Sequence, residues 1–193
     1  MREAKKQGMT IKPIRTMINH STTEIFFDNV PIPASSLIGE EGKGFRYILS
    51  GMNAERILVA SESIGDGRYF IRKASEYARD RMVFGRPIGQ NQGIQFPIAR
   101  SFTEVEAAEA ILDKACRFYE AQDARTGTYA NMAKMLASEA AWNAGDNCMQ
   151  TFGGFSVAEE YDIERKFREA RLYRIAPIST NLILSFKIGR AHV

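Results

Sequence analysis

The pattern of apolar positions along the chain changes once, near Gly44. From there to Met82, apolar residues recur at steps of three and four, which predicts one long amphipathic helix. Gly65 and Gly67 interrupt this pattern, and we expect the helix to bend around them.

Three further helices follow with the same spacing. Gly153 and Gly154 come directly after the third helix and are typical of a C-terminal cap, and Asp162 is placed to cap the fourth. Long helices joined by short connections pack as an antiparallel bundle, so the expected fold is mainly α. The predicted ranges are 98–119, 132–152 and 163–170, followed by a last apolar run over 182–186.

Residues 1–36 predict β-structure instead. Residues 23–27 (TEIFF) are rich in β-branched and aromatic side chains, and Pro13 and Pro31 confine the neighbouring strands to short or edge positions. Two or three short strands do not form a stable domain alone. We therefore expect residues 1–36 to be the truncated end of a larger β domain, and residues 37–186 to form a helical-bundle domain.

Composition excludes several classes of protein and of site. The 193 residues are 45% hydrophobic and 25% charged, as in ordinary globular domains. A net charge of +3 is too small to indicate nucleic-acid binding, and no run of about 18 apolar residues predicts a membrane span. Cys116 and Cys148 fall in apolar helical patterns and are predicted to be buried free thiols. His20 and His192 have no partner at ligand spacing, so no metal site is expected.

The connection from Arg81 to Phe96 (RMVFGRPIGQNQGIQF) is rich in polar and turn-forming residues. Arg81, beside a glycine turn, is suited to binding a phosphate through two hydrogen bonds. A cation favoured by the helix macrodipole at a C-terminus is the simpler explanation from the residues alone. Gly153 and Gly154 also have a functional and a structural explanation. They would allow a ligand to approach the backbone closely, and they would equally serve to end a helix.

Glu55 lies mid-helix between Met52 and the apolar residues 57–59. Apolar surroundings disfavour the charged form of a carboxylate, which is the environment that a general base near neutral pH needs. A salt bridge or a solvated position is the commoner explanation for a helical glutamate.

Two other segments have a composition that could indicate nucleic-acid or phosphate binding. The basic residues of 165–174 alternate with Glu164 and Glu169, which favours a solvated helix face. The glycines of 39–44 (GEEGKG) lack the Ser or Thr that follows the lysine of a phosphate loop, so they predict a plain loop.

Four segments, in this order along the chain, resemble the acyl-CoA dehydrogenase family. They correspond to the entry to the first helix of its C-terminal domain, its cofactor-gripping turn, its Gln-x-x-Gly-Gly…Glu-Tyr segment and the helix before its active-site loop. The segments are 41–45 (EGKGF), 81–96, 150–161 and 168–173 (REARLY).

The resemblance implies an FAD-dependent enzyme with a helical N-terminal domain, a β middle domain and a C-terminal bundle, assembled as a tetramer or dimer. It also implies three sets of residues that contact FAD. These are Arg81, Phe84 and Gln92 in one active site, Gln150, Gly153 and Gly154 reaching FAD from a neighbouring subunit, and Ser179 and Asn181 near the flavin.

The resemblance also implies which residue acts as the base. The best-known base of the family is a glutamate in the loop after the fourth helix, but here Pro177 occupies that position and cannot accept a proton. A minority of the family, including isovaleryl-CoA and long-chain enzymes, carry the glutamate on the first helix, and residues 53–56 (NAER) resemble that arrangement. Glu55 would remove the α-proton of an acyl-CoA while the β-hydrogen leaves as hydride to the flavin. Asn53 and Arg56 would bind the substrate.

Electron-transferring flavoprotein is the implied electron acceptor, within fatty acid metabolism, in a bacterial cytoplasm or a mitochondrial matrix. An acyl-CoA oxidase, a flavin monooxygenase of the same fold and an inactive helical-bundle relative remain alternatives. Without most of the β domain, residues 1–193 alone are expected to show little activity. Residues 187–193 (KIGRAHV) do not continue the last helical pattern and resemble the translated read-through of a sequencing adapter, so a non-native tail is expected.

Overall fold

The computed structural model describes residues 8–18 and 21–191, with side chains up to residue 185. The chain divides into two compact units, Met1–Ser50 and Gly51–Val193, and the division falls inside helix α2.

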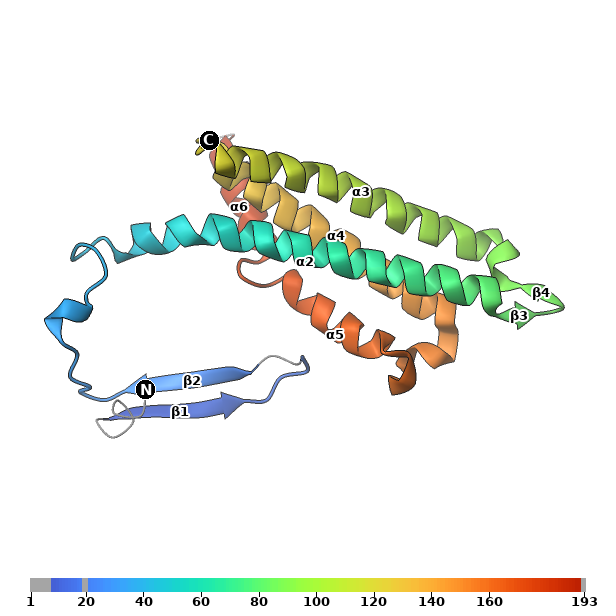
Figure 1. Cartoon of the computed structure of the whole chain (residues 1–193), viewed down its shortest axis with the longest axis horizontal. Helices are drawn as coiled ribbons and strands as arrows, with labels where there is room; N and C mark the ends of the chain where they lie inside the picture. Colours follow the sequence, from blue (N-terminus) through green and yellow to red (C-terminus); the bar gives the residue numbers. More distant parts are fainter. Residues whose placement is uncertain (1–7, 19–20, 192–193) are drawn as a thin grey trace. The chain divides into compact units, whose positions relative to one another are not determined.

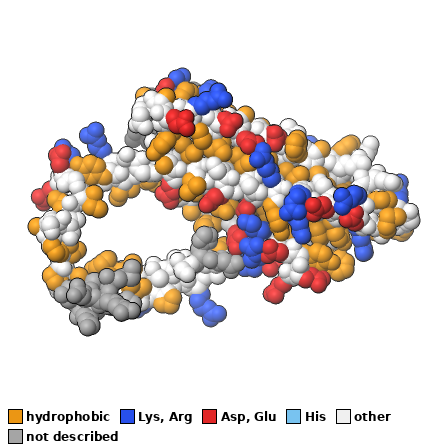
Figure 2. All heavy atoms as spheres, in the orientation of Figure 1, with side chains coloured by type: hydrophobic (Ala, Val, Ile, Leu, Met, Phe, Trp, Pro, Cys, Tyr) orange, Lys and Arg blue, Asp and Glu red, His pale blue; other side chains and the backbone are white. Residues whose placement is uncertain are grey.

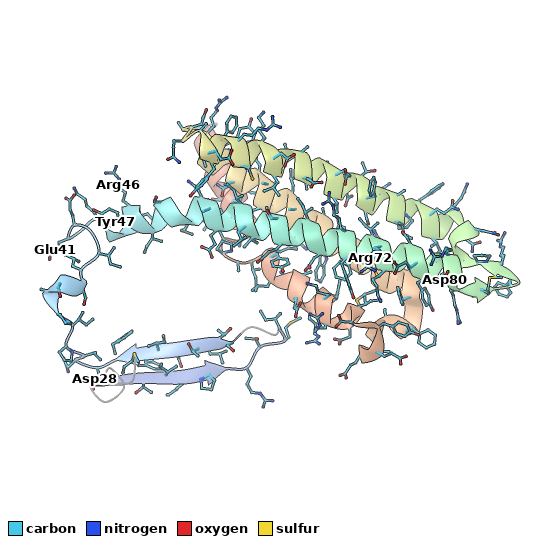
Figure 3. The ribbon with its side chains drawn as sticks, in the orientation of Figure 1. Asp28, Glu41, Arg46, Tyr47, Arg72 and Asp80 are labelled. Atoms are coloured by element: carbon cyan, nitrogen blue, oxygen red, sulfur yellow. The ribbon has the colours of Figure 1, made fainter. Side chains whose placement is uncertain are left out.

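The first unit contains a β-hairpin. Strands β1 (Met9–Ile14) and β2 (Thr22–Phe27) pair antiparallel with Ile11 opposite Ile25, which confirms the predicted β-structure. The hairpin leaves apolar side chains such as Phe27 exposed, because two strands alone have no second layer to cover them. A short 3-10 helix, η1 (Ala34–Ser36), follows, and the loop after it meets the first turn of α2 where the Tyr47 hydroxyl accepts a hydrogen bond from the Glu40 amide, 3.1 Å away (Figure 3).

The second unit is the predicted antiparallel bundle (Figure 1). Its apolar core is built mainly from alanines, which let the helices α2, α3 and α4 approach closely. The α-helices of the described chain are α2 (Gly44–Asp80), α3 (Gln92–Glu120), α4 (Thr126–Phe152), α5 (Ile163–Tyr173) and α6 (Thr180–Ala191).

The long first helix is unbroken at the glycines where a bend was expected. α2 continues through Gly65 and Gly67. A Cβ added at Gly67 would lie 2.7 Å from the Val105 Cγ2, which is too close for any real contact. Gly67 therefore serves close packing between α2 and α3.

Several predicted boundaries were wrong. α3 begins at Gln92, inside the segment expected to be a connection, and α4 begins at Thr126. α6 continues to Ala191, so residues 187–191 do extend the last helix, contrary to expectation, while residues 192–193 lie outside the described residues. The end of α4 was predicted correctly, since Gly153 takes a φ of 60° there.

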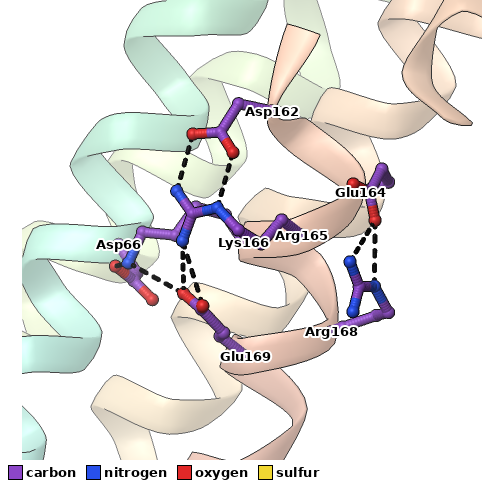
Figure 4. A network of polar contacts seen from close by, with 7 residues as sticks. All are labelled: Asp66, Asp162, Glu164, Arg165, Lys166, Arg168 and Glu169. Carbon is purple, nitrogen blue, oxygen red and sulfur yellow. Dashed lines mark hydrogen bonds and ion pairs between the residues drawn. The ribbon is translucent and has the colours of Figure 1, made fainter. Parts of the chain in front are cut away.

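The basic face of α5 also differs from expectation, because it is half-buried and paired (Figure 4). Lys166 reaches across to the buried Asp66 of α2, with 2.6 Å between Nζ and Oδ1. Arg165 pairs with both Glu169 and Asp162. Asp162 therefore binds Arg165 and makes no capping hydrogen bond to the start of α5. The Lys166–Asp66 pair attaches α5 to α2, so the face is not simply solvated.

Charges elsewhere are mixed in sign. Acidic and basic side chains interleave on the visible face of the helices (Figure 2), and Arg72 on α2 pairs with Glu76 one turn later (Figure 3). Neither of the two described cysteines forms a disulfide, and burial raises the pKa of the Cys148 thiol to about 12. Within residues 8–18 and 21–191, no helix is long and apolar enough to cross a membrane and no group of side chains could hold a metal ion.

Candidate active site

A hollow of about 460 Å³ lies where α2 and α4 end, and it gathers several of the predicted cofactor-binding residues. Beneath it, the rings of Tyr77 and Phe152 stack with their centroids 4.0 Å apart. Around it are Arg81 and Val83 after α2, with Ile88, Gln150, Thr151, Gly153, Gly154 and Phe155.

Arg81 is available for a ligand in this hollow. Its side chain is exposed, its guanidinium lies 5.8 Å from the Phe155 ring centroid, and it has no carboxylate partner among the described residues. Gly153 and Gly154 have open space where a side chain would stand, so a ligand can approach their backbone closely. A guanidinium beside open glycine backbone and an aromatic floor suits a phosphate or diphosphate group.

Phe84 and Gln92 do not line this hollow. A two-residue hairpin turn connects β3 (Met82–Val83) to β4 (Arg86–Pro87), with φ values of 52° at Phe84 and 77° at Gly85. This turn leaves Phe84 fully exposed, and Gln92 is exposed at the start of α3. The structure therefore brings Arg81 together with Gln150, rather than with the two residues predicted to share its role.

Glu55, the predicted base, is exposed on α2, which agrees with the solvated position that is commoner for a helical glutamate. Successive residues of a helix point about 100° apart. The next residue, Arg56, faces the bundle and is only 8% exposed, and its neighbour therefore points outward.

Arg56 is held inside the bundle by neutral oxygen atoms. Its guanidinium donates to Asn53 Oδ1 at 2.9 Å, to Asn131 Oδ1 on α4, and to the Met52 carbonyl at 2.9 Å. Burial lowers the pKa of the Arg56 guanidinium, and the neighbouring Glu55 carboxylate opposes that effect. The two predicted substrate-binding residues, Asn53 and Arg56, thus bond to each other and connect α2 to α4.

A second buried cation, Lys134, was missed from the sequence. It lies on α4 one turn after Asn131, is 0% exposed, and donates from Nζ to the Ile178 carbonyl at 2.7 Å. Burial lowers its pKa to about 8. The sequence did contain a signal for its burial, because this lysine interrupts the apolar face formed by Ala130, Ala133 and Ala137 of the same helix.

Ser179 and Asn181 follow Ile178 at the start of α6 and border a small hollow of about 160 Å³. The Ser179 hydroxyl accepts a hydrogen bond from the Leu182 amide at 3.2 Å, which caps α6. Arg171 and Arg174, which were predicted to belong to a solvated face, line the same hollow.

The predicted site residues therefore fall into two groups at opposite ends of the α2–α4 pair. Glu55 and Arg81 are separated by about 39 Å along α2, at a rise of ~1.5 Å per residue. Gln150, Gly153 and Gly154 lie with Arg81, whereas α4 links the Asn53–Arg56 turn to the loop before Ser179.

Known proteins share both the sequence and the fold of this chain. Residues 42–177 match the family described as acyl-CoA dehydrogenase, C-terminal domain. The chain is 38% identical over 164 residues to acyl-CoA dehydrogenase FadE12 of Mycobacterium bovis, covering 84% of this chain and 42% of that protein. It is 37% identical over 187 residues to cyclohex-1-ene-1-carbonyl-CoA dehydrogenase of Syntrophus aciditrophicus, covering 97% of this chain and 43% of the relative.

Among solved structures, butyryl-CoA dehydrogenase from Megasphaera elsdenii superposes with a TM-score of 0.90 and 31% identity. That match covers 95% of this chain and 49% of the other, so the chain spans about half the length of the proteins it resembles. The family match alone covers more than half of the chain. This chain therefore belongs to the acyl-CoA dehydrogenase family, whose members are FAD-dependent enzymes.

Proposed function

We propose that this chain supplies the C-terminal helical part of an acyl-CoA dehydrogenase that introduces an α,β double bond into an acyl-CoA thioester. Because the chain spans about half of its relatives, the activity is proposed for the chain joined to the remaining domains of the family, here termed the complete enzyme. Residues 1–193 alone are expected to be inactive, since the described residues before α2 contain two strands, β1 and β2, of the β structure that would bind the flavin.

The arrangement of Arg81 and Glu55 carries the proposal. The hollow beside Arg81 fits a cofactor diphosphate, because an unpaired guanidinium and open glycine backbone face the same space. Glu55 lies about 39 Å away, farther than one dinucleotide extends. We therefore place Glu55 of one copy and the Arg81 hollow of a second copy at the same FAD, which makes the enzyme an oligomer of at least two copies.

In this proposal, bound FAD supplies the hydride acceptor. The Glu55 carboxylate removes the α-proton of the acyl-CoA and holds it, while α2 keeps the carboxylate at a fixed position along the helix. Since this chain leaves Glu55 exposed, the substrate and the rest of the site must exclude water from it. Ser179 and Asn181 lie at the N-terminus of α6, where backbone donors favour electron-rich groups.

The wider assignments belong to the same proposal. The substrate is an acyl-CoA, the acceptor of the electrons is electron-transferring flavoprotein, and the enzyme acts in the bacterial cytoplasm or the mitochondrial matrix. The relatives include enzymes named for a cyclic acyl-CoA and for butyryl-CoA, so a test of substrates must include cyclic and short straight chains.

The deciding experiment is an anaerobic spectral titration of the complete enzyme with a panel of acyl-CoAs. Wild type should lose the absorbance of oxidised flavin, and Glu55→Gln should do so about 10²–10⁴-fold more slowly while retaining FAD. Glu62→Gln is the matched control, because Glu62 is exposed on nearly the same side of α2 two turns later.

Equal bleaching in wild type and Glu55→Gln would show that another residue is the base. No bleaching with any acyl-CoA would leave only the fold in common with the family. Rapid reoxidation of the reduced flavin by oxygen would favour an oxidase or a monooxygenase.

A further inference from the structure

Buried lysines are rare, and Lys134 is buried without a carboxylate within ion-pair distance in the described part of the chain. Its bonding partner is a neutral carbonyl, that of Ile178. A well-packed apolar side chain would fill this position at a lower cost in desolvation. The burial of this ammonium therefore requires a benefit other than the stability of the bundle.

The carbonyl that Lys134 binds belongs to the connection between α5 and α6. This connection is folded back on itself, since the Thr180 amide donates to the Arg174 carbonyl at 3.2 Å. The Ile183 amide then donates to the Ser179 carbonyl at 3.0 Å, which begins α6. Lys134 thus attaches to α4 the segment that presents Ser179 and Asn181, two residues of the proposed site.

One turn earlier on the same buried face of α4, Asn131 contacts the turn of α2 that carries Glu55. Asn131 is 3% exposed and accepts a hydrogen bond from Arg56, which also donates to Asn53. Residues three apart on a helix are neighbours on its surface. A single turn of α4 therefore fixes both segments that form the Glu55 end of the proposed site.

We propose that Lys134 and Asn131 are positioning residues that set the spacing between the Glu55 turn of α2 and the Ile178–Asn181 segment. Neither residue touches substrate in this proposal, and each acts through the backbone or the side chain that it binds. The inference rests on the proposed function, because it assigns these residues to that same site.

The first test measures backbone amide hydrogen exchange in the 193-residue chain. Lys134→Met keeps the length and volume of the side chain but removes the donor. It should speed exchange at Thr180, Leu182 and Ile183 by at least 10-fold, with little change in α3. Lys166→Met is the matched control, since it removes another cationic contact, the one to Asp66, at a distance from this connection. Its effect should stay within α5 and the turn of α2 that carries Asp66.

The second test measures turnover in the complete enzyme. Lys134→Met should lower kcat for acyl-CoA at least 10-fold, with less than a 3-fold change in KM and unchanged FAD content. Lys134→Arg retains a cationic donor and should restore most of kcat. Lys166→Met should alter stability but keep kcat within about 2-fold. If Lys134→Met does not fold, Lys134→Gln, whose donor is neutral and one bond shorter, is measured in its place, and the same loss of kcat and faster exchange are expected.

Two results would overturn the inference. One is equal amide exchange at residues 180–183 in Lys134→Met and Lys166→Met. The other is an unchanged kcat in Lys134→Met. Failure of the proposed function is a separate outcome, since wild type would then reduce no flavin with any acyl-CoA, and the exchange experiment would still decide whether Lys134 holds the segment.

Discussion

The two ends of the α2–α4 helix pair both present basic side chains, but in opposite environments. At the C-terminal end, Arg81 is exposed beside an open hollow and has no acidic partner among the described residues. At the other end, Arg56 and Lys134 are buried and bind neutral oxygens. Hydrogen bonds within the chain offset the desolvation of Arg56 and Lys134. Arg81, by contrast, keeps its hydrogen-bonding capacity for a ligand.

This contrast gives the two ends different roles. A solvated cation gains most of its favourable interaction when an anion arrives, so the Arg81 end is suited to binding. Buried cations that are hydrogen-bonded to neighbouring segments hold those segments at fixed distances, so the Arg56–Lys134 end is suited to positioning. In the proposed enzyme the two roles meet only when two copies are present.

The largest expected effect tests whether the two ends work in different copies. A Glu55→Gln copy and a copy with Arg81→Ala and Gln150→Ala should each be nearly inactive without added FAD. When the two variants assemble together, each mixed pair contains one site in which both Glu55 and the Arg81 hollow are wild type. Random pairing should therefore restore about a quarter of wild-type turnover, measured as flavin reduction by acyl-CoA.

Turnover of the mixture no greater than the sum of the separate variants would mean that one copy supplies both ends. The control is to mix the Glu55→Gln copy with itself under the same conditions, which should restore nothing.

The next effect concerns the stability of the buried end. Asn131→Leu removes the acceptor of the Arg56 guanidinium and leaves a buried charge short of a partner. We expect the free energy of unfolding to fall by about 3 kcal/mol. Urea denaturation of the 193-residue chain measures this through its single tryptophan, Trp142, which stacks on Phe167 with centroids 4.4 Å apart.

Asn147→Leu is the matched control on the same helix. Asn147 donates to Ser101 Oγ at 2.9 Å, which is a neutral partner, so the loss should be about 1 kcal/mol. Equal losses in the two variants would contradict a special role for the buried charge.

Much of this contrast could not be predicted from the sequence. Periodicity was sufficient for the helices and for the end of α4 at Gly153, because local backbone preferences decide both. It was not sufficient to decide which of two adjacent charged residues faces the core. Glu55 and Arg56 differ by one position, and the acceptor that Arg56 meets on the facing helix, Asn131, lies 75 residues away in the sequence.

The same limit applies to the hairpin and to Lys134. Phe84 adopts a left-handed φ that a bulky residue rarely takes, and no local pattern in the sequence predicts it. Lys134 depends on a carbonyl that lies 44 residues later in the chain, so no local pattern could reveal its partner. The resemblance to the family divided Arg81 and Gln150 between two subunits, whereas both line one hollow within this chain.

The pH dependence of stability provides a third test of the buried end. Burial lowers the pKa of Lys134 from 10.5 to about 8, with Glu139 opposing and Arg174 adding to the shift. Between these two pKa values the unfolded chain binds the extra proton, so stability must rise as the pH rises. Between pH 7 and 10, wild type should gain about 2–3 kcal/mol of unfolding free energy relative to Lys134→Met.

Wild type must be compared with Lys134→Met, because tyrosines and other lysines titrate in the same pH range. Their contributions to stability are the same in both proteins and cancel in the difference. Urea midpoints measured at half-unit steps of pH would give the curve. A difference that is flat across this range would mean that Lys134 is solvated in the folded chain.

The smallest expected effect concerns the exposed end. Arg81→Ala should weaken FAD binding to the complete enzyme by about 10–100-fold, since a charge-assisted hydrogen bond contributes roughly 1.5–3 kcal/mol. Arg81→Lys keeps the charge but loses the second parallel hydrogen bond, so its affinity should lie between those of wild type and Arg81→Ala.

Arg79→Ala is the matched control, because Arg79 lies two residues away and pairs with its neighbour Asp80 at 2.7 Å. Flavin fluorescence titrations should give nearly the wild-type affinity for this control. If Arg79→Ala and Arg81→Ala weaken binding equally, general surface charge attracts the cofactor, and the contrast between an open, unpaired cation and the buried ones loses its functional meaning.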